Sequence, residues 1–352
     1  MAAAKKLKFK DSVALHSALQ GDIRSGRFAP IYLLMGKESY FIDSLTDLLA
    51  NSLLPEEERA FNQIVVYGKD SNVGQIINFA RQMPMMGSRQ VVIIKDAAAL
   101  RNIDQLSLYT ASPSPTTVLV ISYKGGTIDK RTALYKQCEK VGIVFESVEP
   151  YDNEIGPWLE GFIRAKGIQI EPRALVMLTE NLGKEITKIV SELDKLLTYL
   201  PEGTTRITAD DVERNIGISK DFNVFELLSS FAAGDMRRSL MIGEHLMQNA
   251  RALPTGEIFG YFQKIFIINY KRWESKYRGA PVTSDNELAQ LLGVHPFFLG
   301  EYKQAAARFP NKKVFHIFDL LREYDMRSKG IGTGSATLGE LMRELILKIY
   351  MQ

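Results

Sequence analysis

The sequence predicts a parallel α/β domain followed by two helical domains, a small one and a larger one. Three observations lead to this fold class. Short apolar runs alternate with helical patterns over residues 1–150, which is typical of a parallel sheet covered on both faces. The strand signals then stop, and only helical patterns continue. Proline and glycine divide that helical part, so we expect domains over residues 1–150, 151–218 and 219–352.

Five strands are expected in the first domain. Each is a short, mostly apolar run, at residues 31–35, 64–67, 91–94, 116–122 and 143–145. Runs of this length that are rich in β-branched residues favour strands over helices. Because they are apolar throughout, the sequence predicts a five-stranded sheet with helices on both faces.

Helices are expected between these strands. Apolar residues recur at helical spacing over residues 38–51, and Pro55 prevents that helix from continuing. Residues 73–80 carry one apolar face, and residues 129–141 also have a helical pattern. These segments predict the crossover helices that a parallel sheet needs.

The small unit after residue 150 is predicted to be all-helical. Helical patterns cover residues 155–165, 172–183 and 186–200, and residues 208–211 resemble a capping box that begins another helix. Five to seven further helical segments are expected beyond residue 221. Their predicted interruptions are at residues 234, 254, 279–281, 296, 310 and 330–334.

The composition indicates a soluble cytoplasmic protein. The 352 residues include 44 lysines and arginines against 41 aspartates and glutamates, a net charge of +3, which does not suggest a coat for nucleic acid. The single cysteine, Cys138, excludes a disulfide framework and fits a reducing compartment. No apolar run has the length of a signal peptide or a membrane span, so no membrane partner is expected.

The turn after the first predicted strand resembles a degenerate phosphate loop. A working loop needs a GxxxxGK[ST] pattern, but only Gly36 and Lys37 fit it, and Glu38 stands where a hydroxyl is required. Asp96, beside Lys95, is only a weak candidate for a Mg²⁺ ligand. We therefore expect no nucleotide binding here and no cofactor.

No catalytic residue and no metal site are expected elsewhere. The four histidines lie far apart in the sequence without the spacing of metal ligands. Cys138 lies in a helix rich in lysine and glutamate and lacks the surroundings of a nucleophile. Enzymatic chemistry within this chain has no visible site.

Residues 82–90 are the most unusual stretch of the sequence. Met83, Pro84, Met85 and Met86 lie between a predicted helix and a predicted strand. Methionine side chains adapt to hydrophobic surfaces of other proteins, and the proline favours an exposed turn. Packing of these methionines into the core is the alternative interpretation.

A second candidate surface combines basic and aromatic residues near the end of a long predicted helix. Lys271, Arg272, Trp273 and Arg278 are its main members. Such clusters can hold phosphates and stack on bases. A solvated helix face whose aromatic side chains are buried explains the pattern equally well.

Eight segments resemble the delta-subunit family of bacterial DNA polymerase III clamp loaders. None of them is diagnostic alone, but their order and spacing match the family over essentially the whole chain. The segments are residues 32–36, 85–90, 129–131, 191–196, 207–212, 224–227, 292–299 and 325–330.

The resemblance implies an AAA+-like architecture with a RecA-type domain, a helical lid and a C-terminal collar for oligomerisation. Such a subunit does not hydrolyse ATP itself. It binds the ring-shaped sliding clamp, the beta subunit, and holds one interface of the ring open. Its partners are ATPase and delta-prime-type subunits in a heteropentamer, with primer-template DNA inside. The complex is part of a DNA-directed DNA polymerase holoenzyme at replication forks, which implies association with the nucleoid.

The resemblance also implies a clamp-binding site. A hydrophobic pair just before a Ser-Arg-Gln sequence inserts into the clamp in this family, and here that pair falls on Met85 and Met86, with Met83 and Pro84 alongside. The family often has Leu-Phe or a similar pair, so two methionines are a departure. Because they cost more ordering entropy and lack an aromatic ring, we expect a lower affinity for the clamp.

Two alternatives remain at this point. One is an active AAA+ ATPase that uses Gly36 and Lys37. The other is a stand-alone DNA-binding helical protein that uses the basic and aromatic residues between 261 and 278.

Overall fold

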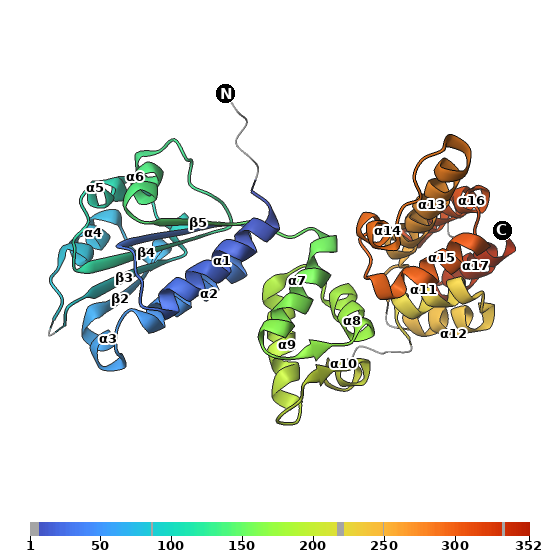
Figure 1. Cartoon of the computed structure of the whole chain (residues 1–352), viewed down its shortest axis with the longest axis horizontal. Helices are drawn as coiled ribbons and strands as arrows, with labels where there is room; N and C mark the ends of the chain where they lie inside the picture. The colour runs from blue at the N-terminus through green and yellow to red at the C-terminus, as the bar shows by residue number, and fades with distance from the viewer. Residues whose placement is uncertain (1–6, 86, 217–221, 249, 333–334) are drawn as a thin grey trace. The chain divides into compact units, whose positions relative to one another are not determined.

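The computed structural model describes residues 7–85, 87–216, 222–248, 250–332 and 335–352. The chain divides into two compact units, Met1–Tyr151 and Asp152–Gln352, and each is described by itself (Figure 1).

The first unit contains the predicted parallel sheet. All its strand pairs are parallel, and the order is β2-β3-β4-β1-β5. This confirms the predicted fold class for the first part of the chain. The strands are β1 (Ile31–Gly36), β2 (Gln63–Tyr67), β3 (Gln90–Lys95), β4 (Thr117–Lys124) and β5 (Ile143–Ser147).

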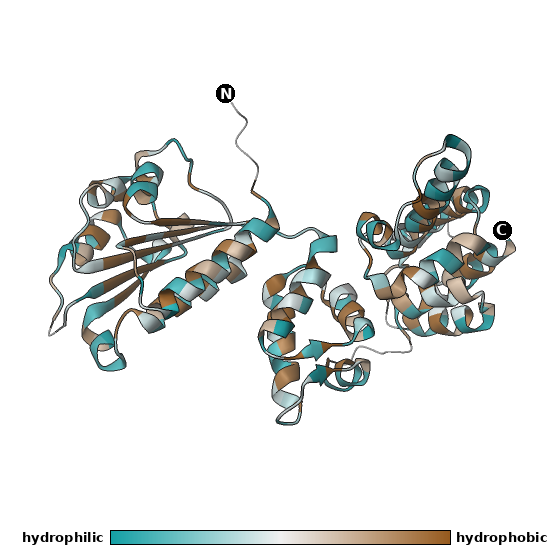
Figure 2. Ribbon diagram, in the orientation of Figure 1, coloured by the Kyte–Doolittle hydropathy of each residue, from teal (hydrophilic) through white to brown (hydrophobic). Residues whose placement is uncertain are grey.

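Alternate residues of the central strands enter two separate layers of side chains. Ile31, Leu33 and Met35 of β1 lie in one buried cluster with Ile76 and Cys138 from two helices. Since successive residues of a strand point to opposite faces, the intervening residues bury the other face. The central strands are accordingly hydrophobic along most of their length (Figure 2).

Helices cover both faces of the sheet, as the sequence predicts. Helices α1 and α2 lie on one face, and α4, α5 and α6 lie on the other (Figure 1). The helices of this unit are α1 (Phe9–Arg24), α2 (Ser39–Ser52), α3 (Glu56–Asn62), α4 (Val73–Arg81), α5 (Ser107–Thr110) and α6 (Ala133–Val141), with short 3-10 turns η1 (Gly68–Asp70), η2 (Ala97–Ala99) and η3 (Ile103–Leu106).

Helix α6 begins later than the predicted residue 129. The Asp129 carboxylate accepts a hydrogen bond from the main-chain N–H of Arg131, at 2.9 Å. This local turn competes with helical hydrogen bonding. Thr132 then caps the helix by accepting the N–H of Tyr135, so the helix begins at Ala133.

The second unit begins with four helices and two very short strands. The helices agree with the predicted ones and are α7 (Asp152–Ala165), α8 (Pro172–Leu182), α9 (Ile186–Tyr199) and α10 (Ala209–Ile216). The prediction of an all-helical segment was wrong in one respect, because β6 (Gln169–Ile170) and β7 (Arg206–Ile207) pair in parallel. Two-residue strands are too short to leave a periodic signal in the sequence.

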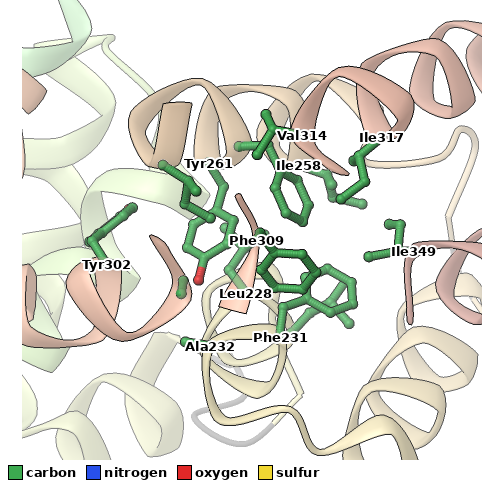
Figure 3. Packing of buried hydrophobic residues seen from close by; sticks show 14 of the residues in the cluster. Leu228, Phe231, Ala232, Ile258, Tyr261, Tyr302, Phe309, Val314, Ile317 and Ile349 are labelled. Atoms are coloured by element: carbon green, nitrogen blue, oxygen red, sulfur yellow. The ribbon is translucent and has the colours of Figure 1, made fainter. Parts of the chain in front are cut away.

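The rest of the described chain is helical around one core. That core brings together Leu228 and Phe231 of one helix, Tyr261 of a second helix and Phe309 from the end of a third (Figure 3). Within the described residues the helices number seven, in agreement with the prediction of five to seven. They are α11 (Val224–Ala233), α12 (Met236–Met247), α13 (Thr255–Arg278), α14 (Asp285–Leu292), α15 (Leu299–Arg308), α16 (Asn311–Ser328) and α17 (Leu338–Met351), with a 3-10 turn η4 (Pro296–Phe298) before α15.

Candidate functional site

Strand polarity places the two candidate sites of the first unit at opposite edges of the sheet. In the register, Ile31 of β1 pairs with Leu119 and Gln90 of β3 pairs with Thr117, so both strands begin at the same edge. Residues 82–89 lead into β3 at that edge. Gly36 ends β1 at the other edge, where parallel α/β sheets usually bind nucleotides.

The turn at Gly36 is closely packed. Its φ angle is 137°, and its N–H donates to the carbonyl oxygen of Gly126 at 2.8 Å. A Cβ at this position would clash with main-chain atoms of Ser147. The glycine is therefore required by the approach of β5, and this packing explains it without any ligand.

Glu38 occupies the helix end that a phosphate would need. Its side chain is buried and accepts the N–H of Tyr40, at 2.9 Å, as the N-cap of α2. Its main-chain carbonyl accepts the hydroxyl of Ser147, at 2.8 Å. Since helix N-termini bind anions through free N–H groups and the helix dipole, a carboxylate at this point opposes phosphate binding.

The weak candidate for a Mg²⁺ ligand, Asp96, is paired with a lysine. Nζ of Lys124 lies 3.1 Å from carboxylate oxygens of both Asp96 and Asp43. Partial burial alone would lower the pKa of Lys124, but the hydrogen bonds to the two carboxylates outweigh burial and raise it. An ammonium group thus stands between two carboxylates at the edge where a nucleotide's divalent cation would lie.

The methionine loop, residues 82–89, precedes β3 at the other edge and exposes both of its described methionines. Met83 is 78% exposed and Met85 is 62% exposed, whereas Pro84 is half-buried. Packing into the core is therefore wrong for Met83 and Met85. Met86, the fourth predicted site residue, lies outside the described residues.

Asn62, at the end of α3, holds the main chain of this loop. Its amide nitrogen donates to the carbonyl oxygen of Met85, at 2.9 Å, and its amide oxygen accepts the N–H of Met85, at 2.6 Å. A Cβ at Gly87 would clash with the Glu58 carboxylate, so the loop lies tightly against α3. The guanidinium of Arg89 lies 5.1 Å from the centre of the Phe28 ring.

Sequence reasoning missed Asn62 and its neighbour Phe61. Helix α3 begins with three glutamates and buries only Asn62, so it has no apolar face for a pattern to detect. Phe61 is 64% exposed beside the residue that holds the loop. The only sequence signal that could have indicated Phe61 is that it is an aromatic residue in an otherwise polar stretch.

In the second unit, the C-terminal part of α13 presents exposed aromatic rings. Trp273 lies between Tyr270 and Tyr277, with ring centres 5.9 and 6.2 Å apart, and the rings of all three are exposed. The guanidinium of Arg278 lies 5.1 Å from the Trp273 ring centre. The alternative in which these aromatic residues are buried is therefore wrong.

The predicted basic cluster is only partly assembled. Lys271 forms an ion pair with Glu274 at 2.7 Å. Its ammonium group is therefore less available to bind a phosphate. Arg272 reaches the carbonyl oxygen of Lys303 at 3.5 Å. Of the four predicted residues, the structure brings together Trp273 and Arg278.

Among the described residues, no helix combines the length and the apolar character that crossing a bilayer requires.

Comparison with known proteins identifies similar chains. Residues 32–148 match the model of the family "DNA polymerase III, delta subunit". DNA polymerase III subunit delta of Bacillus subtilis is 24% identical over 340 residues, which cover 94% of each chain. The solved structure of the Bacillus subtilis DNA clamp loader delta protein has a TM-score of 0.52 at 24% identity, and the match covers 96% of this chain and 100% of that one.

A weaker structural similarity was also found. The Thermotoga maritima RuvB Holliday junction branch migration motor gives a TM-score of 0.38 at 15% identity, over 85% of this chain and 87% of that one. A score this low supports no inference.

Proposed function

This chain resembles the delta subunit of DNA polymerase III over nearly its whole length, and on that premise we propose that it is a clamp-loader subunit that binds the sliding clamp. The subunit holds one interface of the ring open for loading onto primed DNA. The observation that carries the proposal is the exposure of Met83 and Met85 on a loop that Asn62 holds through the main chain of Met85.

The methionine loop has the properties of a hydrophobic anchor. Burial of apolar surface contributes roughly 25 cal/mol per Å², so two methionine side chains contribute a few kcal/mol, enough for a binding hot spot. Binding that is tighter to the open ring than to the closed ring shifts the clamp toward opening without local chemistry. We therefore assign clamp binding to Met83, Pro84, Met85 and Met86.

The proposed subunit neither binds nor hydrolyses ATP. Three arrangements support this: the tight packing of Gly36, the buried carboxylate of Glu38 at the start of α2, and the ion pairs of Lys124 with Asp43 and Asp96. Each of them opposes a bound phosphate or its cation. ATPase subunits of the same complex then supply the energy for loading.

The remaining partners follow from the same proposal. Residues 1–150 form the AAA+-like clamp-binding domain, residues 151–218 the lid and residues 219–352 the collar that joins ATPase and delta-prime-type subunits in a heteropentamer. Primer-template DNA passes through this assembly. Trp273 and Arg278 are candidates for contact with it, because exposed rings and a nearby guanidinium suit stacking on bases.

The decisive experiment measures binding of the purified chain to its host's sliding clamp, with an ATP-binding assay in parallel. We expect tight clamp binding without ATP binding. The double variant Met85→Ala with Met86→Ala is expected to lose clamp binding and keep the thermal unfolding midpoint of the parent chain. Lys37→Ala is the matched control, since Lys37 is an exposed residue at the opposite edge of the sheet, and it should bind the clamp normally.

Two outcomes would overturn the proposal. Unchanged clamp affinity in the double methionine variant would remove the loop from the interface. ATP binding without clamp binding would revive the ATPase that uses Gly36 and Lys37.

A further inference from the structure

We propose that Asn62 is the positioning residue of the methionine loop. It sets the main-chain conformation of the loop before a partner arrives. This inference rests on the proposed function, because it assigns a role to a residue behind the proposed clamp-binding surface.

The geometry of Asn62 suits this role. Its side-chain amide forms two hydrogen bonds with a single residue, donating to the carbonyl oxygen of Met85 at 2.9 Å and accepting its N–H at 2.6 Å. This is the pairing that a neighbouring β-strand would provide. The Asn62 side chain therefore provides the hydrogen bonds of a neighbouring strand at Met85, one of the exposed methionines of the loop.

Asn62 itself cannot touch a partner. Its side chain is only 1% exposed, whereas the Met85 side chain extends into solvent. The register explains how the two come together: Gln63 of β2 pairs with Val91 of β3, so α3 and the loop enter the same edge of the sheet on neighbouring strands. Asn62 thus acts through the backbone of Met85.

The physical consequence is a lower entropic cost of binding. Fixing a flexible loop during association subtracts from affinity, and a loop that is already ordered avoids this cost. The methionine side chains still have to be ordered when they are buried, but the main chain of Met85 does not. This saving offsets part of the entropic cost of ordering two methionines, at a position where the related family often has less flexible residues.

The first test needs no partner. Amide hydrogen exchange of the free chain, measured by NMR, should show a protected N–H at Met85 although the side chain of that residue is exposed. Asn62→Ala should make this amide exchange at least tenfold faster. An unprotected Met85 amide in the parent chain would overturn the inference whatever the clamp does.

The second test measures the dissociation constant for the sliding clamp. Asn62→Ala should weaken binding about tenfold. Asn72→Ala is the matched control: Asn72 caps α4, the helix that leads into the loop, by accepting the N–H of Gln75 at 2.9 Å. It should lower the thermal unfolding midpoint to a similar extent without weakening clamp binding. Equal affinity losses in the two variants would show that Asn62→Ala weakens binding only by destabilising the fold, and would overturn the inference.

A double-mutant cycle separates failure of the inference from failure of the proposed function. If Asn62 acts through Met85, Asn62→Ala should have little effect on affinity once Met85→Ala has removed the anchor. An affinity loss from Met85→Ala without one from Asn62→Ala would refute the positioning role alone. No loss from Met85→Ala would refute the proposed clamp site itself.

Discussion

Arg173 and Glu226 form an ion pair of 2.7 Å between α8 and α11, two helices that lie on either side of residues 217–221 in the sequence. The carboxylate of Glu226 is mostly buried and also holds Arg238 of α12 at 2.8 Å. One acidic side chain therefore links the beginning of the second unit to its larger helical part.

Glu226→Gln should lower the free energy of unfolding of the second unit by about 1–3 kcal/mol. The reason is that it leaves two guanidinium groups beside a neutral, partly buried amide. Urea denaturation measures this loss. Asp319→Asn is the control, since its pair with Arg322 is long and exposed, and it should change stability by less than about 0.5 kcal/mol. Equal effects would contradict a special role for Glu226.

The first unit should lose stability in mild acid because of His16. Burial, and secondarily the charge of Arg24, lower the pKa of His16 to about 4, while an unfolded histidine has a pKa of about 6.5. Between these values the unfolded chain takes up a proton that the folded chain does not. The free energy of unfolding should therefore fall as pH drops from 6.5 toward 4, by roughly 3 kcal/mol in total.

Urea denaturation between pH 7.5 and pH 4.5 tests the His16 prediction. His16→Gln keeps a side chain that can contact Ser44, which lies 3.3 Å from Nε2 of His16. This variant should show a flatter dependence of stability on pH over that range. An unchanged slope would assign the acid sensitivity to other groups.

Gly36→Ala should destabilise the first unit by about 2–4 kcal/mol, because the added Cβ meets main-chain atoms of Ser147 at a backbone angle that favours glycine. Gly21→Ala is the opposite case. Gly21 lies inside α1 with open space around it, so alanine should stabilise the helix by about 0.5–1 kcal/mol. Thermal denaturation shows whether each variant is less stable or more stable than the parent chain. A tolerated alanine at residue 36 would mean that β5 can move away.

Trp273 and Arg278 should contribute to DNA binding in different ways. Trp273→Ala should weaken binding to a single-stranded oligonucleotide by about 1–2 kcal/mol at every salt concentration, since stacking is not screened. Arg278→Ala should instead reduce the slope of log affinity against log salt by roughly 0.7. Fluorescence anisotropy in a salt series measures both. Phe297→Ala, at a more exposed ring in η4, should change neither the affinity nor its dependence on salt.

The predictable part of the fold is the part built from apolar periodicity. Strands β1, β3 and β4 are buried on both faces and therefore have uninterrupted apolar sequences. Helix α1 was missed, because Ser12 and His16 stand at two of its buried positions. A hydrophobic pattern cannot register a buried face that is polar, although the spacing of the buried residues is helical.

The candidate site was predictable only in its exposed members. The proline and the run of methionines indicate a protruding turn, and the structure exposes Met83 and Met85 there. The contact of Asn62 with Met85 joins residues 23 positions apart and depends on the pairing of β2 with β3. No local pattern contains that information, since an asparagine in a polar helix is ordinarily a surface residue.

The buried thiol on α6 makes the chain convenient for labelling. Cys138 is the only cysteine, it lies within the core of the sheet, and burial raises its pKa to about 12. Maleimide dyes react with exposed thiolates, so the native cysteine should remain unlabelled in the folded chain. A cysteine introduced at the rim of the methionine loop would then carry a single fluorophore and report partner arrival in real time, with no need to engineer a cysteine-free background.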